Sequence, residues 1–264
     1  VARVAFNTDF SAFVAISSSV STRFVLESFS IRSGETTQKT GTIAYPERQV
    51  TVSFETVQPR LYSFRNNTGE ICYGCLYLPP NYDASKQYPC ILHIYAGPHV
   101  QTVKNSYAMK LHGRCQLMAS LGFVVVQQDG RGSFNRGLAF EGYLRNSMGQ
   151  FEIDDHITGI RSLVSGQNME NMKVSIDLKR VGIFGWSYGG YASLLALAHY
   201  PDFFKVAVSG APVTDWALYD TGYTERYMDT PQNNPEGYKK GSILTNAFKF
   251  PDDEDRLLII HGLS

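Results

Sequence analysis

Apolar and polar positions alternate along the first part of the chain in the manner of short β-strands. Residues 12–16, 22–29 and 50–54 combine β-branched and aromatic side chains, and turns rich in Ser or containing Gly separate them. This hairpin-like spacing predicts antiparallel strands, but the segment is too short to bury a core of its own. We expect it to be either an extension or the last piece of a repeat domain.

From Leu61 onward the pattern changes to strands that alternate with helices. Residues 61–65 and 74–78 predict a β-hairpin across Asn66-Asn67-Thr68-Gly69. Further strands are expected at 90–95, 123–127, 180–184, 204–208 and 257–260, and helices at 104–121, 151–164 and 191–199. This alternation indicates a mostly parallel sheet with helices on both faces.

The turn between the predicted strand 180–184 and helix 191–199 contains Gly185-Trp186-Ser187-Tyr188-Gly189. It matches the G-x-S-x-G nucleophile elbow of α/β hydrolases, in which a sharp strand-to-helix turn exposes the serine hydroxyl. Glycines flank the serine because the turn leaves no room for side chains there. The alternative is a glycine-rich turn with a chance serine, but the flanking strand and helix favour Ser187 as a nucleophile.

In this fold the acid and the histidine of a catalytic triad follow the serine along the chain. Residues 256–262 predict the strand that should deliver the carboxylate, and the sequence ends at Ser264. We therefore expect the chain to be truncated before the Asp and His of the triad. His261 is expected to anchor a strand end or shape the site, and Asp154 and Asp155 to start a helix rather than form an acid pair.

Composition and charge narrow the classes of function. Hydrophobic residues make up 43% and charged residues 18% of the chain, as is usual for a globular protein. Lys plus Arg and Asp plus Glu both number 24, and no block of like charge stands out, so no nucleic-acid partner is expected. No apolar run is long enough to predict a membrane segment.

Of the four cysteines, Cys72 and Cys75 are predicted to be buried or half-buried free thiols rather than metal ligands. Cys72 and Cys75 have the spacing of a zinc-binding pair, but no second pair completes such a site. Three residues apart on a strand, they are expected on opposite faces of the sheet. Asn66-Asn67-Thr68 matches a glycosylation sequon, but its composition also favours a turn, which we prefer.

Several motifs are similar to those of the dipeptidyl peptidase branch of the prolyl oligopeptidase family (peptidase family S9), and most of all to its cytosolic members. They lie at residues 94–98, 129–133, 136–142, 148–150, 185–191, 210–214 and 223–228. The resemblance implies an α/β-hydrolase fold preceded by the last strands of a truncated β-propeller. Residues 1–55 would be the propeller remnant and connector, and residues 56–264 the truncated catalytic domain.

The resemblance also implies catalytic roles for three residues. Ser187 would be the nucleophile, and the backbone N–H of Tyr188 and the phenol of Tyr95 would be the two oxyanion donors. Without the resemblance, Tyr95 would more simply be a core tyrosine with a backbone partner.

A hydrophobic box for a proline side chain is implied at Tyr188, Val213, Trp216, Tyr219 and Tyr223. The last four recur every three or four residues, which predicts one face of a helix, a spacing that is also typical of an ordinary core stripe. Arg226 would either contact substrate or pair with a local carboxylate.

Together with these features, the resemblance implies a serine exopeptidase that releases N-terminal X-Pro or X-Ala dipeptides without a metal or cofactor. The chain by itself is expected to be inactive. The resemblance further implies peptide substrates, a cytoplasmic location and a homodimer in the complete protein. Two alternatives are a catalytically silent interaction protein and an acyl-peptide hydrolase or esterase on the same fold. The intact Ser187 and Tyr95 argue against the first, and Tyr95 and the aromatic box against the second.

Overall fold

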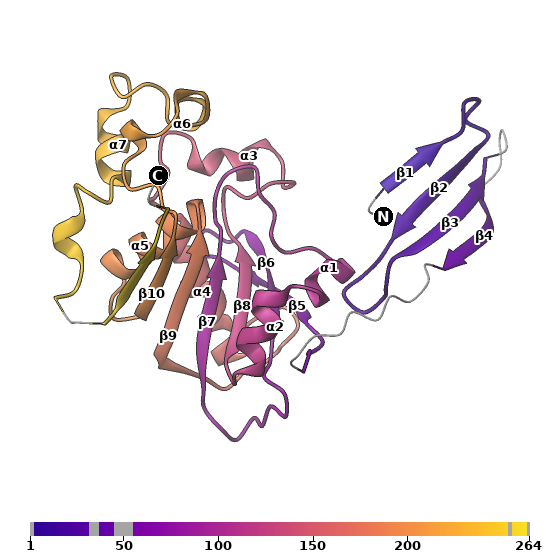
Figure 1. Ribbon diagram of the computed structural model, residues 1–264, viewed down its shortest axis with the longest axis horizontal. Coiled ribbons are helices and arrows are strands. Elements are labelled where there is room, and N and C mark those ends of the chain that lie inside the picture. The colour runs from indigo at the N-terminus through magenta and orange to yellow at the C-terminus, as the bar shows by residue number, and fades with distance from the viewer. Residues whose placement is uncertain (1–2, 32–36, 45–54, 253–254, 263–264) are drawn as a thin grey trace.

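The computed structural model describes residues 3–31, 37–44, 55–252 and 255–262, and its strands form two sheets (Figure 1). The N-terminal sheet is antiparallel, with the strands in chain order. They are β1 (Arg3–Phe6), β2 (Ala12–Ser17), β3 (Val25–Ser30) and β4 (Gln38–Ala44). The strands expected at 12–16 and 22–29 are thus confirmed as β2 and β3, although β3 begins later. The strand expected at 50–54 lies outside the described residues.

The N-terminal sheet encloses little core, as its length predicts. Phe13 and Phe29 stack across β2 and β3 with ring centroids 4.7 Å apart, and Ala15 is buried. The other described side chains of these strands are at least partly exposed. The β2–β3 loop contacts the rest of the chain, because Val20 N–H donates to Asn105 Oδ1 over 3.1 Å.

The larger sheet has seven strands in the order β11-β10-β9-β7-β8-β6-β5. The hairpin at one edge is antiparallel, as is the β6–β8 pair, and the five strands from β8 to β11 run parallel. The strands are β5 (Arg60–Arg65), β6 (Ile71–Tyr77), β7 (Tyr88–Ile94), β8 (Val124–Asp129), β9 (Ile176–Trp186), β10 (Phe204–Gly210) and β11 (Leu257–Ile260). The predicted mostly parallel sheet is therefore confirmed.

The sequon residues form the turn of the β5–β6 hairpin. Asn66 Oδ1 accepts from the backbone N–H groups of Thr68 and Glu70 over 3.1 and 2.9 Å, and Asn66 is buried. An Asn side chain that closes its own turn in this way explains why the sequence favours a turn here.

Helices cover both faces of the sheet (Figure 1). The α-helices are α1 (Tyr107–Lys110), α2 (Gly113–Ser120), α3 (Leu138–Glu141), α4 (Glu152–Ser165), α5 (Tyr188–His199), α6 (Thr221–Met228) and α7 (Pro235–Gly241). Short 3₁₀ turns are η1 (Gly142–Leu144), η2 (Trp216–Leu218) and η3 (Ala247–Lys249). None of the helices in the described part of the chain is long and apolar enough to cross a membrane.

The prediction of a single helix at 104–121 was wrong. This segment forms two helices, α1 and α2, and each begins at its own cap. Ser106 Oγ accepts from Ala108 N–H at the start of α1, and His112 Nδ1 accepts from Cys115 N–H at the start of α2. Side-chain caps of this kind restart a helix where the apolar period alone would continue it.

The core consists of two clusters on opposite faces of the larger sheet. Cys72 belongs to the larger cluster, with α4 and α5, and Cys75 to the smaller one, with α2. The predicted placement of these two residues on opposite faces is therefore confirmed. All four cysteines are buried free thiols, and burial raises the pKa of both Cys72 and Cys75 to about 12.

Candidate active site

Ser187 is the single residue between the end of β9 and the first residue of α5. Its backbone has φ +58° and ψ −119°, a left-handed conformation that costs free energy in any residue with a Cβ. The Ser187 N–H donates to the carbonyl of Gly210 over 2.9 Å, which ties the turn to β10. The turn therefore holds the serine in the strained geometry that the G-x-S-x-G pattern predicts.

The two glycines of the motif are required by close backbone approach. A Cβ on Gly185 would lie 2.2 Å from the carbonyl oxygen of Gly189, and a Cβ on Gly189 would lie 2.2 Å from that of Ile94. Neither oxygen can move, because both belong to the backbone. The expected reason for the flanking glycines is confirmed at both positions.

Tyr95 follows directly after β7 and its phenol lies next to Ser187. Burial raises the pKa of Tyr95, the neighbouring Tyr219 adds to the shift, and a side-chain hydrogen bond with Ser187 acts in the opposite direction. A phenol is protonated at neutral pH even at its ordinary pKa, so Tyr95 can act as a hydrogen-bond donor. The Tyr95 ring also packs at 6.1 Å from that of Tyr188.

The aromatic residues expected in a proline box come together beside the elbow. Trp216 is fully buried and stacks on Tyr223 with centroids 6.0 Å apart. Tyr219 stands edge-on to both rings at 5.9 and 5.6 Å, and Tyr188 lies 5.4 Å from Trp216. Val213 is partly buried against the same core. The rings thus form one continuous apolar wall.

No single helix contains the residues of the predicted aromatic box, so the prediction that they line one face of a helix was wrong. Trp216 lies in η2, Tyr219 follows it in extended backbone, and Tyr223 belongs to α6. Asp215 and Asp220 cause the interruption, because each accepts a backbone N–H two or three residues ahead over 2.9 Å. Two successive Asp caps end one helical turn and start another. The rings meet through tertiary packing.

Arg226 lies on α6 with an exposed side chain. No carboxylate among the described residues lies within ion-pair distance of it. The alternative of a local carboxylate partner for Arg226 therefore finds no support in the described structure.

A buried carboxylate that the sequence reasoning missed, that of Glu152, holds Tyr188 in place. The Tyr188 hydroxyl donates to Glu152 Oε1 over 2.6 Å, and Glu152 also accepts from the backbone N–H groups of Gly149 and Phe151. Glu152 is 2% exposed, and burial raises its pKa, against the hydrogen bond from Tyr188. The signal available in the sequence was an acidic residue at the first position of helix α4.

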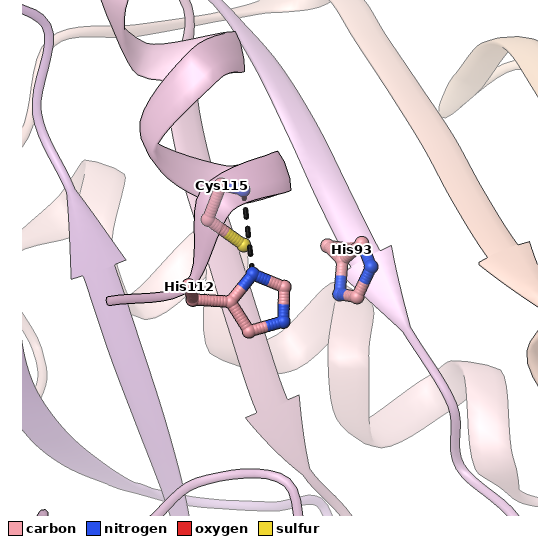
Figure 2. Close-up of side chains that lie close together, drawn as sticks. All are labelled: His93, His112 and Cys115. Carbon is pink, nitrogen blue, oxygen red and sulfur yellow. Dashed lines mark hydrogen bonds between the residues drawn. The ribbon is translucent and has the colours of Figure 1, made fainter. Parts of the chain in front are cut away.

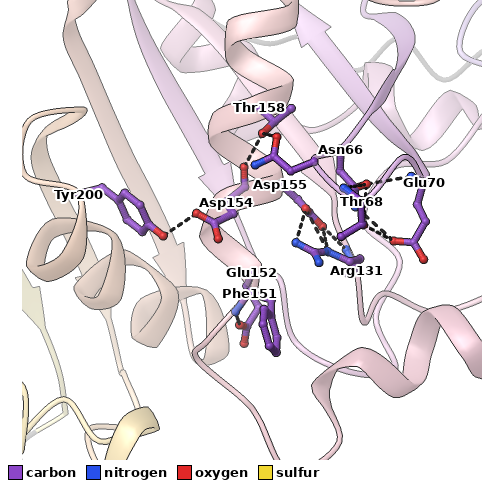
Figure 3. Close-up of polar contacts among 11 residues, drawn as sticks. Asn66, Thr68, Glu70, Arg131, Phe151, Glu152, Asp154, Asp155, Thr158 and Tyr200 are labelled. Carbon is purple, nitrogen blue, oxygen red and sulfur yellow. Dashed lines mark hydrogen bonds and ion pairs between the residues drawn. The ribbon is translucent and has the colours of Figure 1, made fainter.

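Asp155, expected only to start a helix, is also one half of a buried ion pair. It lies in the first turn of α4, but its carboxylate accepts from Arg131 Nε, Nη2 and backbone N–H over 2.8–3.1 Å (Figure 3). Both side chains are nearly inaccessible to solvent. The pair fastens the segment 129–133 to α4. Asp154 instead accepts a hydrogen bond from Tyr200 over 2.6 Å.

The histidines make contacts of their own. His93 contacts Gln127 and His156 contacts Gln128, and burial lowers the pKa of both imidazoles to about 4. His261 follows β11, is exposed, and contacts the carbonyl of Gly262.

Comparisons with known proteins agree on one family. Residues 109–264 match the sequence signature of the prolyl oligopeptidase family. Dipeptidyl peptidase 8 from Homo sapiens and from Mus musculus is 50% identical over 204 residues, which cover 77% of this chain and 22% of the relative. A "Probable dipeptidyl-aminopeptidase B" from Arthroderma gypseum is 37% identical over 185 residues, which cover 70% of this chain and 19% of the relative.

A solved structure shares the fold over nearly the whole chain. It is a "putative dipeptidyl aminopeptidase IV" from Bacteroides ovatus, with a TM-score of 0.86 and 30% identity over 98% of this chain and 35% of that chain. The chain spans about a fifth of the length of the curated relatives it matches.

Proposed function

Because the chain belongs to the prolyl oligopeptidase family and has its α/β-hydrolase fold, we propose that it carries the nucleophile and the specificity pocket of a serine dipeptidyl peptidase. Residues 56–264 would be catalytic domain, and residues 1–55 the end of a β-propeller with its connector. The observation that carries the proposal is the strained Ser187, with the Tyr95 phenol beside it and an aromatic wall next to both.

The proposed reaction is acyl transfer through Ser187. Its Oγ attacks the scissile carbonyl carbon and passes its proton to a general base, while the carbonyl oxygen becomes an oxyanion. The backbone N–H of Tyr188, at the positive end of α5, and the hydroxyl of Tyr95 donate to that oxygen. Collapse breaks the C–N bond, the shortened peptide leaves with a proton, and water then hydrolyses the dipeptidyl ester on Ser187.

The aromatic wall supports a preference for proline at the second substrate residue. A rigid pyrrolidine ring packs well between flat aromatic faces, and a small box excludes longer side chains by overpacking. Glu152 fixes the Tyr188 side of this box by its 2.6 Å hydrogen bond. Val213, Trp216, Tyr219 and Tyr223 would form the rest, and Arg226, exposed on α6, is proposed to contact the substrate.

Two other functions are less well supported. A protein kept only for binding has no use for a strained serine, because the strain lowers stability without aiding an interface. An acyl-peptide hydrolase or esterase would not need the aromatic wall. A cytoplasmic location and a homodimer stay predictions from the resemblance.

The test uses a longer protein that contains this sequence and has the length of the curated relatives. It should release p-nitroaniline from Gly-Pro-p-nitroanilide, more slowly from the Gly-Ala analogue, and not from an acetylated alanine anilide. Ser187→Ala should reduce kcat by about 10⁶-fold. The chain of 264 residues alone is expected to be nearly inert. Unchanged turnover in Ser187→Ala, or faster cleavage of the acetylated substrate, would refute the proposal.

A further inference from the structure

Two histidines and a cysteine meet on the α2 face of the sheet. His93 comes from β7, and His112 and Cys115 come from the cap and first turn of α2 (Figure 2). Each of the three offers one ligand atom, and these atoms all lie within 4.8 Å of one another. The His93 and His112 rings lie edge-on to each other, with an interplanar angle of 70° and centroids 5.0 Å apart. None of the three takes part in the reaction proposed above.

We propose that His93, His112 and Cys115 bind a single Zn²⁺ ion, with water at the fourth position. Two imidazole nitrogens and one thiolate are a ligand set that zinc prefers over harder divalent cations. Binding releases the thiol proton of Cys115 to solvent as its Sγ bonds to the metal. The two imidazoles are neutral before and after zinc binds.

The distances suit zinc after a small closure. Zinc takes sulfur at about 2.3 Å and nitrogen at about 2.0–2.1 Å, so tetrahedral ligand atoms lie about 3.3–3.6 Å apart. The observed separations, up to 4.8 Å, must shrink by at most about 1.2–1.5 Å, which side-chain rotation supplies. The hydrogen bond from Cys115 N–H to His112 Nδ1 is long, 3.4 Å, so little interaction energy is lost when the His112 ring turns.

The surroundings of the cluster favour a metal held by the fold. Cys115 is fully buried in the smaller core cluster, so its thiol is protected from bulk solvent. Gln127 contacts His93 Nδ1 over 3.0 Å, and a partner on one ring nitrogen orients the other toward a metal. If zinc takes Nε2, the Gln127 amide turns so that its oxygen accepts from Nδ1–H.

Arg114, between the two α2 ligands in sequence, is the neighbouring group that opposes a cation. Its guanidinium lies over the Phe184 ring, 5.7 Å from the centroid. Deprotonated Cys115 cancels one charge of Zn²⁺, so the metal and its three ligands carry a net charge of about +1. Zinc here would link the start of α2 to β7, two residues before Tyr95, and would act as a structural cross-link.

The test is Co²⁺ titration of the untagged, reduced, metal-free chain, followed by absorbance. We expect saturation at one Co²⁺ per chain, a thiolate-to-cobalt charge-transfer band in the near ultraviolet, and the visible bands of tetrahedral cobalt. Zn²⁺ should displace the cobalt and raise the Tm by mass action. A cobalt spectrum without the charge-transfer band, or no saturable binding, would overturn the proposal.

Variants locate the site on these three residues. Cys115→Ser should lose the charge-transfer band and the zinc-dependent rise in Tm, and His93→Gln and His112→Gln should each weaken Co²⁺ binding. Cys90→Ala, on the opposite face of β7, and His261→Gln, at the exposed end of β11, should bind as the original chain does. Circular dichroism without metal checks folding. If Cys115→Ser does not fold, the test rests on His112→Gln, because His112 is only half-buried. Co²⁺ binding that is unchanged in His112→Gln would refute the site.

Discussion

Replacing Asp155 by Asn should destabilise the chain far more than the same change in an exposed ion pair. Asp155 is completely buried and accepts three side-chain hydrogen bonds from Arg131, whose side chain is 6% exposed. An Asn can still accept the Arg131 backbone N–H with its Oδ1, so the substitution mainly removes the charge. A buried guanidinium left without its counter-charge costs about 3–5 kcal/mol of unfolding free energy.

The chain provides a matched control in the exposed pair between Arg180 and Asp177. These side chains are 53% and 28% exposed, and Nε lies 2.8 Å from Oδ2. Because solvent screens such a pair, Asp177→Asn should cost at most about 1 kcal/mol. The comparison holds the chemistry of the substitution constant and changes only the burial.

The assay is urea unfolding of each variant followed by tryptophan fluorescence, with the free energy taken from the midpoint at constant m-value. A third variant, Arg131→Met with Asp155→Asn, removes the stranded cation and should be more stable than Asp155→Asn alone. With Arg131→Met alone as the fourth corner, the double-mutant cycle should give a coupling of about 1–3 kcal/mol. If Asp155→Asn costs no more than Asp177→Asn, the buried pair does not fasten the segment 129–133 as we infer.

Three further predictions concern the pocket. In the longer enzyme, Tyr95→Phe should lower kcat by roughly 10²–10³-fold with little change in KM, because its donor acts on the developing oxyanion. A rise in KM alone would make Tyr95 a binding or structural residue. Tyr223→Ala should cost about 1–3 kcal/mol in kcat/KM for X-Pro substrates and less for X-Ala, and equal losses would assign Tyr223 to the fold. Glu152 has its pKa raised in the folded state, so it binds more protons folded than unfolded. Relative to Glu152→Gln, the unfolding free energy of the original chain should therefore fall as pH rises from the usual Glu pKa of 4.5 through the folded pKa. Parallel pH profiles would contradict that assignment.

The part of the candidate site that the sequence predicts is the part that depends on interactions between neighbouring residues. A strand, a G-x-S-x-G turn and a helix follow one another within about twenty residues, so the position and strain of Ser187 are consequences of short-range sterics. Tyr95 and the aromatic box were found through motif resemblance, which transfers tertiary information from relatives. The single helix expected for the box failed, because the caps at Asp215 and Asp220 compete locally with the apolar period.

The pairings among distant residues were decided by the tertiary structure alone. Glu152 meets Tyr188 across 36 residues, and Asp155 meets Arg131 across 24. His93 reaches His112 only because β7 and the start of α2 pack on one face of the sheet. Sequence by itself determined the strands of the larger sheet, the elbow and the turn at Asn66, since each depends on neighbouring residues. Which buried polar groups become partners depends on how the elements pack, and a buried charge is tolerated only where that packing supplies its counterpart.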